Sequence, residues 1–362
     1  MLSEIGSNFW ISPNEIVGTP DIGTPEQFGC KGSDFVWMST GRSATRMVLQ
    51  TILQRNPDIK KVALIPAFTC HTVIEPFLDF GFSIHTLPMS VDMMTNVAEI
   101  TSSLADTHAT VLLVHRYYGF DTLPGFNKEI KKIQNNGVVV IEDCTQCLYS
   151  TFEISNADYF VGSIRKWCGV PDGGFAVCRE GGFLEKPENE DKELQDAKIE
   201  ASRLKYDYIF NGKDCKPESK QKYREAEHIL DTQTRYYTIS SSSEIIQTYL
   251  DTVALSNARR RNFDVLVAGM HGILGISLVF DTLPQGIVPL YLPILIDERE
   301  KIQSLLADNA VYAPVVWPKA DCCPSICKEA DILYNHLLCI PIDQRYNVDD
   351  MQRILTVLKS QE

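Results

Sequence analysis

The sequence predicts an α/β protein with one large, mostly parallel sheet of seven strands, followed by a smaller α+β domain. Between Phe35 and about Arg179, short β-branched runs alternate with helical stretches, which is typical of a parallel sheet covered by helices. After Ser240 a long helical region leads into a different mixture of strands and helices. The chain has 362 residues, more than one small core needs, so two domains are expected.

Seven short segments of the first part have the composition of strands, and two helices stand out between them. The predicted strands are 35–38, 62–65, 83–87, 110–115, 138–142, 159–163 and 174–178. Residues 44–54 carry apolar side chains at helical spacing, and 126–134 form a second amphipathic stretch that ends at Asn135-Asn136-Gly137. Helices should therefore connect successive strands.

The later part begins with a change of composition. Residues 180–222 are rich in charge and are interpreted as an excursion or lid that faces solvent. We expect a large domain over 1–240, which includes this excursion, and a linking helix with a small domain over 241–362. The small-domain elements are a helical region over 240–269, a β-rich run at 287–296, a helix at 298–309, a strand at 311–316 and a helix at 348–360.

The charge balance disfavours nucleic acid as a partner. Basic side chains number 34 and acidic ones 47, so the net charge is −13 and the field repels a phosphate backbone. The longest weakly polar run, 265–280, contains His271 and falls short of the ~20 apolar residues that span a bilayer. Residues 1–10 lack the pattern of a signal peptide, so we expect a cytoplasmic protein without membrane partners.

Eleven cysteines, an odd number in a long chain, are interpreted as reduced thiols. Cys144 and Cys147 have CxxC spacing, and Cys322, Cys323 and Cys327 form a second cluster. Neither cluster has the matching ligand pair that a structural zinc site needs, so no metal is expected. A thioredoxin-like redox role for Cys144 and Cys147 remains a weaker alternative.

Three features carry candidate chemistry. Residues 138–143 form a buried-type strand that ends in Glu142 and Asp143, where an acid can meet a cofactor at the carboxyl edge of the sheet. The alternative is that Asp143 caps the next helix. Lys166 follows another strand and precedes a glycine-rich turn, a setting in which a desolvated lysine can form a Schiff base. The alternative is a solvated loop lysine.

The third feature is Thr40-Gly41-Arg42-Ser43, placed between a strand and a helix. Backbone N–H groups at a helix start, approached closely at Gly41, can bind a phosphate, and Arg42 can reinforce the site. Alone the pattern also fits a simple cap. Together, the phosphate segment, the strand-end Asp143 and Lys166 form the set that a pyridoxal phosphate enzyme requires.

The sequence also resembles the pyridoxal phosphate-dependent aminotransferases of the DegT/DnrJ/EryC1 group, which have fold type I. The most specific segments are Glu142-Asp143-Cys-Thr-Gln146, similar to the family's Glu-Asp-Ala-Ala-Gln, and Ser163-Ile-Arg-Lys166 with Asp172-Gly-Gly174, similar to its Ser…Lys…Glu-Gly-Gly. Supporting segments are Thr40-Gly-Arg-Ser-Ala44, Ile65-Pro-Ala-Phe-Thr69, His115-Arg-Tyr-Tyr-Gly119 and Leu338-Cys-Ile-Pro341. The resemblance therefore covers most of the chain.

The resemblance implies a role for each matching residue. Lys166 would attach the cofactor covalently, Asp143 would keep the pyridinium nitrogen protonated, and Gln146 would hydrogen-bond the ring 3′-oxygen. Ser163 and the backbone at Gly41, Arg42 and Ser43 would bind the phosphate. A carboxylate beside the ring nitrogen favours its protonated form, which makes the ring an electron sink.

Two segments depart from the family pattern. The position whose aromatic side chain commonly covers the cofactor ring falls at Cys70, with His71 beside it. The family's Asn-Tyr-Arg segment, whose Asn reaches the partner subunit's phosphate, falls at 239–243, which reads Ile-Ser-Ser-Ser-Ser. We therefore expect that this contact is missing or made by a serine, and that the substrate can differ from the family's usual nucleotide sugar.

Further residues are interpreted with alternatives. Tyr118 lines the substrate cleft or is packed, and Trp317 borders the substrate or covers an edge strand. His115 is expected to be structural, and Arg259-Arg260-Arg261 to form an exposed helix face.

The prediction is a homodimeric aminotransferase that moves an amino group, with glutamate as the expected donor, to a keto or aldehyde acceptor such as a nucleotide-linked keto sugar. The alternatives are another pyridoxal phosphate reaction such as dehydration, and a non-catalytic regulatory or binding protein that keeps the fold.

Overall fold

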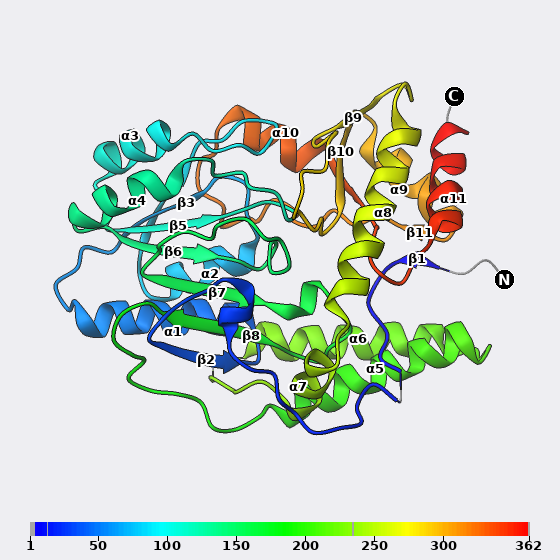
Figure 1. Ribbon diagram of the computed structural model, residues 1–362, viewed down its shortest axis with the longest axis horizontal. Helices are drawn as coiled ribbons and strands as arrows, with labels where there is room; N and C mark the ends of the chain where they lie inside the picture. Colours follow the sequence, from blue (N-terminus) through cyan, green and yellow to red (C-terminus); the bar gives the residue numbers. More distant parts are fainter. Residues whose placement is uncertain (1–3, 13, 234, 361–362) are drawn as a thin grey trace. The chain divides into compact units, whose positions relative to one another are not determined.

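A computed structural model describes residues 4–12, 14–233 and 235–360 and contains the predicted seven-stranded sheet (Figure 1). The strand order is β2-β8-β7-β6-β5-β3-β4. The strands are β2 (Asp34–Met38), β3 (Val62–Pro66), β4 (Ser83–Leu87), β5 (Val111–His115), β6 (Val139–Asp143), β7 (Tyr159–Ser163) and β8 (Gly174–Cys178). The predicted fold class is confirmed, and each predicted strand lies within one residue of its observed bounds.

The described chain divides into two compact units, which are treated separately. The first comprises residues 4–7, 52–159 and 252–360, and the second comprises 8–12, 14–51, 160–233 and 235–251. The predicted division into 1–240 and 241–362 stays a prediction.

In the first unit, four strands run parallel. Strand β3 pairs with β4 and β5, and β5 pairs with β6, with His115 opposite Asp143. Helices α2 (His71–Asp79), α3 (Val97–Thr107) and α4 (Phe126–Asn135) connect them. The sequence predicted α4 but not α2, whose Pro76 lies inside the helix, nor α3, whose start is marked by the capping side chain of Asn96.

The C-terminal part of the first unit contains an antiparallel sheet in the order β12-β10-β9. Its strands are β9 (Ile276–Leu278), β10 (Leu292–Ile296) and β12 (Leu337–Ile340), and its helices are α8 (Thr252–Met270), α9 (Arg299–Asp308), α10 (Lys328–His336) and α11 (Val348–Lys359). Strand β1 (Ile5–Gly6) pairs in parallel with β11 (Val311–Tyr312). The run at 287–296 is a strand only over its second half, where its backbone pairs with both neighbours.

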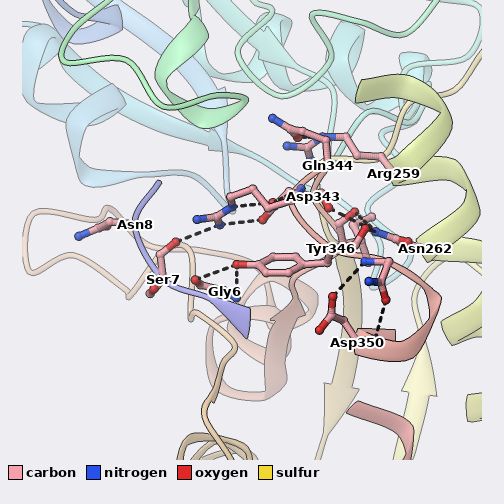
Figure 2. Close-up of polar contacts among 12 residues, drawn as sticks. Gly6, Ser7, Asn8, Arg259, Asn262, Asp343, Gln344, Tyr346 and Asp350 are labelled. Atoms are coloured by element: carbon pink, nitrogen blue, oxygen red, sulfur yellow. Dashed lines mark hydrogen bonds and ion pairs between the residues drawn. The ribbon is translucent and has the colours of Figure 1, made fainter. Parts of the chain in front are cut away.

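The expectation that Arg259, Arg260 and Arg261 form an exposed helix face is wrong for Arg259. This side chain is 1% exposed and donates to Leu290 O at 2.8 Å. It also donates to Gln344 Oε1 at 3.0 Å (Figure 2). Arg260 donates to the Ile287 carbonyl, and Arg261 to Tyr346 O at 2.9 Å. All three arginines donate hydrogen bonds to backbone carbonyl oxygens, because such acceptors need a donor when they are removed from water.

The second unit contains the antiparallel pair β2–β8 and the start of helix α1 (Gly41–Arg55). Helices α5 (Lys192–Phe210) and α6 (Lys216–Thr232) form a hairpin and lie side by side (Figure 1). Helix α7 (Ser241–Thr248) follows. The predicted helical region over 240–269 is therefore two helices, α7 and α8.

The interpretation of 180–222 as a solvent-facing excursion is wrong for one face of its helices, although most of these residues are exposed or half-buried. The α5–α6 hairpin has its own apolar core of Leu194, Ala226 and Leu230. Helix α5 additionally buries Lys198 and Lys205, whose charged ends bind the Glu227 carboxylate and, at 2.5 Å, Asn8 O. Charged side chains can be buried in this way when the stem packs and the head has a fixed partner.

Candidate active site

The ring-binding candidates of the first unit lie at the carboxyl edge of its parallel strands. The segments after β3, β5 and β6 meet there, because parallel strands end at one edge of the sheet. Two hydrogen bonds join them: Tyr117 Oη donates to Phe68 O at 2.7 Å, and Tyr118 N donates to Gln146 Oε1 at 2.8 Å.

The two adjacent acids at the end of β6 have different surroundings. Glu142 is fully buried, pairs with Arg116, and accepts a hydrogen bond from Ser155 N at 3.0 Å. Asp143 is half-buried at the strand end, and its Oδ1 accepts from Thr145 N at 2.8 Å. A turn follows in place of the helix that Asp143 could have capped. The carboxylate of Asp143 is thus oriented by a backbone N–H of the following turn, whereas the charge of Glu142 is balanced by Arg116.

Gln146 is buried with its amide orientation fixed. Because Oε1 accepts from Tyr118 N, the Nε2 end is the one that can donate to a ring oxygen. Tyr118 has a φ of 53°, and Gly119 has a φ of 95° with the Val288 carbonyl where a Cβ would stand. Only glycine fits at position 119, which explains why the segment His115–Gly119 ends in that residue.

Tyr118 has the surroundings of the packed alternative. It is fully buried, and Cys339 Sγ donates to its hydroxyl at 3.4 Å. Burial raises the pKa of Tyr118 well above its ordinary value of 10.0.

Cys70 and His71 stand at the start of α2 in the same unit. Cys70 is the N-cap residue without a side-chain cap bond, and its sulfur accepts from Thr72 Oγ1 at 3.1 Å. The sulfur lies 3.8 Å from His71 Nδ1. Which of the two covers a cofactor ring stays a prediction.

An aromatic cluster around His115 was not predicted from the sequence. Trp317 packs against Phe68 at 5.1 Å and against His115 at 5.4 Å between ring centroids, and Tyr117 lies 4.5 Å from His115. Neither ring nitrogen of His115 has a hydrogen-bond partner among the described residues. Burial lowers the pKa of His115 to about 3, so the ring is neutral.

In the second unit, the structure brings the phosphate-binding candidates together. The start of α1 lies against the end of β7, since a Cβ on Gly41 would stand 3.4 Å from Ser163 Cβ. Gly174 lets the backbone at Thr40 approach, because a Cβ there would be 2.3 Å from the Thr40 carbonyl carbon. Ser163 Oγ donates to Gly173 O at 3.0 Å. The first N–H groups of α1 thus meet Ser163 at one place.

Arg42 and Ser43 are tied to the end of the hairpin. Arg42 donates to Leu230 O at 3.3 Å and pairs with Asp231 at 3.0 Å. Ser43 Oγ donates to Gln233 Oε1 at 3.4 Å, and Gln233 Nε2 donates to Asp191 at 2.6 Å. The Arg42 guanidinium is therefore engaged by the hairpin. The Ser43 N–H is engaged as well, because it donates to Thr40 Oγ1 at 3.0 Å, as in the simple cap that the sequence also allowed.

Lys166 ends the short 3-10 helix η2 (Ile164–Lys166), three residues after Ser163. Its side chain is exposed, so burial does not desolvate the amine as the sequence argument expected. Its charged surroundings within this unit include Lys198 and Glu227.

The serine segment that replaces Asn-Tyr-Arg binds an acid of its own unit. Ser240 Oγ and Ser243 Oγ donate to Asp172 Oδ1 at 2.7 Å and 2.5 Å, and Ser240 N donates to Oδ2 at 3.1 Å. Asp172 is fully buried, and burial raises its pKa to about 6 against the lowering effect of these hydrogen bonds. Sequence reasoning missed this cluster because it joins residues far apart in the chain.

The remaining features do not point to thiol or metal chemistry. None of the eleven cysteines, all of which lie in the described part of the chain, forms a disulfide. A hydrogen bond with Cys144 and burial raise the pKa of Cys147 well above its ordinary value of 9.0, the opposite of what a reactive thiol needs. Over 4–12, 14–233 and 235–360, no group of three or more metal-ligating side chains could hold an ion. The described helices include none with the length and apolarity to cross a bilayer.

No protein-family model matches the chain, and no curated protein sequence matches it. Solved structures do. The chain is similar to a Helicobacter pylori aminotransferase involved in the biosynthesis of pseudoaminic acid, with 12% identity, 99% of each chain covered and a TM-score of 0.70. A sugar aminotransferase from Micromonospora echinospora has 15% identity, 100% of each chain covered and a TM-score of 0.67.

A DegT DnrJ EryC1 StrS aminotransferase from Brucella abortus has 15% identity and a TM-score of 0.64, with 93% of this chain and 87% of that chain covered. These identities are low and the shared length is nearly complete, so the likeness is one of fold. The chain has the fold of the DegT/DnrJ/EryC1/StrS aminotransferases, a fold-type I architecture.

Proposed function

We propose that this protein is a pyridoxal phosphate-dependent aminotransferase that moves an amino group from an amino acid to the carbonyl carbon of a keto sugar. The observation that supports the proposal is the local surroundings of the candidate residues in each unit of this fold. Asp143 and Gln146 stand at the carboxyl edge of the first unit, and Lys166 follows the Gly41–Ser163 contact in the second. Glutamate as donor and a nucleotide-linked acceptor are the finer parts of the proposal.

The residues present fit the cofactor. The helix start at Gly41 and Arg42, with Ser163 against it, suits a phosphate, and the Ser43 N–H would have to exchange its bond to Thr40 Oγ1 to join them. Asp143 suits a protonated ring nitrogen, and Gln146 Nε2 suits a ring oxygen. When bound, pyridoxal phosphate supplies an electron sink that stabilises negative charge at the amino acid Cα.

The side chains have separate tasks in this proposal. Lys166 Nζ would hold the cofactor and, when free, would take the proton from Cα of the amino acid. Asp143 holds a positive charge in place, and Gln146 orients a ring oxygen. We further propose a cytoplasmic homodimer, as in the family that the sequence resembles.

The test is an absorbance spectrum of the purified protein with pyridoxal phosphate, before and after glutamate. A band at the visible edge that Lys166→Ala abolishes, and that glutamate converts, is expected. Lys222→Ala is the matched control, because Lys222 pairs with Glu225 on its own exposed helix face.

Other outcomes change the proposal in stated ways. A Lys166-dependent band that ignores glutamate would point to another donor or to another reaction, such as dehydration. Absence of any Lys166-dependent band would refute the enzyme and favour a binding protein.

A further inference from the structure

A buried arginine of α8 donates to two successive carbonyls of the irregular segment 288–290. Arg259 is 1% exposed, and its Nη1 donates to Leu290 O at 2.8 Å and to Pro289 O at 3.4 Å. Its Nε donates to Gln344 Oε1 at 3.0 Å. Burying a guanidinium costs free energy, but its rigid, charged fork makes stronger hydrogen bonds than a neutral donor. The arginine therefore fixes the backbone of this segment.

The fixed segment is hydrogen-bonded in turn to the loop that holds Gln146. Leu290 N donates to Tyr118 O at 2.9 Å, and Tyr118 N donates to Gln146 Oε1 at 2.8 Å. Arg259 and these three residues are all buried, so the hydrogen bonds between them are shielded from water. A continuous series of hydrogen bonds therefore runs from the guanidinium to the Gln146 amide.

The conformation of Tyr118 depends on support from its surroundings. Its φ is 53°, in the left-handed region that a residue with a side chain rarely adopts, and such a conformation persists where neighbouring contacts hold it. Ser150 provides a second contact, because its hydroxyl donates to Gly119 O at 2.7 Å and accepts from Val288 N at 3.0 Å. The segment 288–290 thus supports this backbone at two points.

The orientation of the Gln146 amide decides what it offers to a ring oxygen. With Oε1 bound to Tyr118 N, the Nε2 donors face away from Tyr118, whereas a flipped amide would present an acceptor in their place. We propose that Arg259 is a positioning residue that keeps the Gln146 amide in its donating orientation, acting through the backbone at Tyr118. The inference deepens the proposed function, on which the role of Gln146 at the ring rests.

The first measurement needs no cofactor. Hydrogen exchange of the full chain, followed by mass spectrometry with residue-level fragmentation, reports on the Tyr118 amide, which binds Gln146. Arg259→Met should accelerate exchange at Tyr118 about tenfold or more, and Arg259→Lys, which keeps a charged donor, should accelerate it less. Arg261→Met is the matched control and should leave Tyr118 unchanged, because Arg261 lies on the same helix and donates to Tyr346 O at 2.9 Å.

The second measurement tests whether the effect passes through Gln146. Absorbance titration gives the affinity for pyridoxal phosphate of Arg259→Met, of Gln146→Ala and of the double variant. Arg259→Met should weaken binding about fivefold, as expected for one hydrogen bond, and should weaken it no further once Gln146 is replaced. Equal losses in both backgrounds would overturn the inference, because they would show a general weakening of the fold.

Two other variants keep the test decisive if Arg259→Met does not fold. Arg259→Lys then replaces it in both measurements, since a single ammonium group cannot reproduce the fork of the guanidinium. Ser150→Ala removes the other support of the same backbone and should also accelerate exchange at Tyr118. Exchange at Tyr118 that is unchanged in the Arg259 variants would overturn the inference.

The result is separable from the proposed function. Faster exchange at Tyr118 without a Lys166-dependent absorbance band would support the positioning of Gln146 and refute the aminotransferase. A glutamate-responsive band with unchanged exchange at Tyr118 would leave the aminotransferase standing and refute the positioning role of Arg259.

Discussion

Asp172 shows how one residue can change the interpretation of a segment. It belongs to the Asp172-Gly173-Gly174 turn, and its carboxylate accepts hydrogen bonds from the hydroxyl groups of Ser240 and Ser243. Both hydroxyls are therefore bound to a carboxylate of their own unit. The serine run is thus an internal support for the turn after Lys166.

Ser243→Ala should destabilise the protein more at high pH than at low pH. The hydroxyl donates to the charged carboxylate, so its loss raises the pKa of Asp172 further above its ordinary value of 3.8. We expect a loss of about 1–3 kcal/mol in the free energy of unfolding at pH 8 and a smaller loss below pH 6.

Urea unfolding at both pH values measures the effect. Ser241→Ala is the control, because Ser241 Oγ donates to Glu190 at 2.6 Å in an exposed position. An equal loss at both pH values would show that the hydroxyl does not act on the carboxylate.

His115 should make the fold sensitive to acid. Its pKa in the folded protein, about 3, lies below the ordinary value of 6.5, so between these values the unfolded chain binds the proton and the native ring does not. Stability attributable to His115 is therefore complete above pH 6.5 and falls as the pH drops toward 3.

His115→Phe should flatten this part of the pH profile of the melting temperature. His271→Gln, at an exposed position, is the control and should leave the profile unchanged. If His115→Phe keeps the full acid sensitivity, other groups cause it. Asp172 acts in the opposite direction between about pH 3.8 and 6, because its native carboxyl binds the proton first.

At the scale of elements, the α5–α6 hairpin is the part of the second unit that supports both chemical segments. Its end holds Arg42 and Ser43 at the start of α1, and its middle holds Arg165 beside Lys166. Polar contacts of one hairpin therefore reach both segments.

Gln233→Ala should weaken phosphate binding while leaving carbonyl attachment intact. Gln233 joins Asp191 to Ser43, and its loss frees the start of α1. We expect the affinity for pyridoxal phosphate to fall about tenfold, a loss of ~1.4 kcal/mol, with no change for pyridoxal, which has no phosphate.

Titration followed by absorbance distinguishes the two ligands. Gln221→Ala is the matched control on α6, since Gln221 contacts only Glu225 at 3.0 Å among the described residues. An equal loss for both ligands would place the effect of Gln233 outside the phosphate segment.

At the scale of the whole chain, the first and last parts of the sequence meet inside the first unit. Gly6 N donates to Tyr346 Oη at 2.8 Å, and the same hydroxyl donates to Gly6 O at 3.1 Å (Figure 2). Strand β1 thereby gains a side-chain partner in addition to its pairing with β11. The early segment is fixed by residues more than three hundred positions away.

Tyr346→Phe should release this segment. Both polar groups of Gly6 lose a buried partner, which costs about 1–3 kcal/mol of unfolding free energy. Hydrogen exchange at residues 5–7 should accelerate, with Tyr249→Phe as control, because Tyr249 Oη accepts a long bond of 3.4 Å from Thr19 N in an exposed position. Unchanged exchange would show that β11 alone holds β1.

Much of the fold and part of the site could be predicted from the sequence. Local β-branched runs predict where the strands lie. Asp143 at the end of one strand and Lys166 shortly after another follow from those runs. These predictions need only neighbours in sequence. The resemblance to the family points to the same two residues, because each lies in a short contiguous motif.

The tertiary structure decided the partners of the charged residues. Local composition gave Arg259 and Lys198 the appearance of exposed charges, whereas each is buried against a distant segment. The hydrogen bonds from Ser240 and Ser243 to Asp172 could not be predicted from the sequence either. Local pattern determines where strands and helices begin, but the charge that a side chain meets is set by packing between segments far apart in the chain.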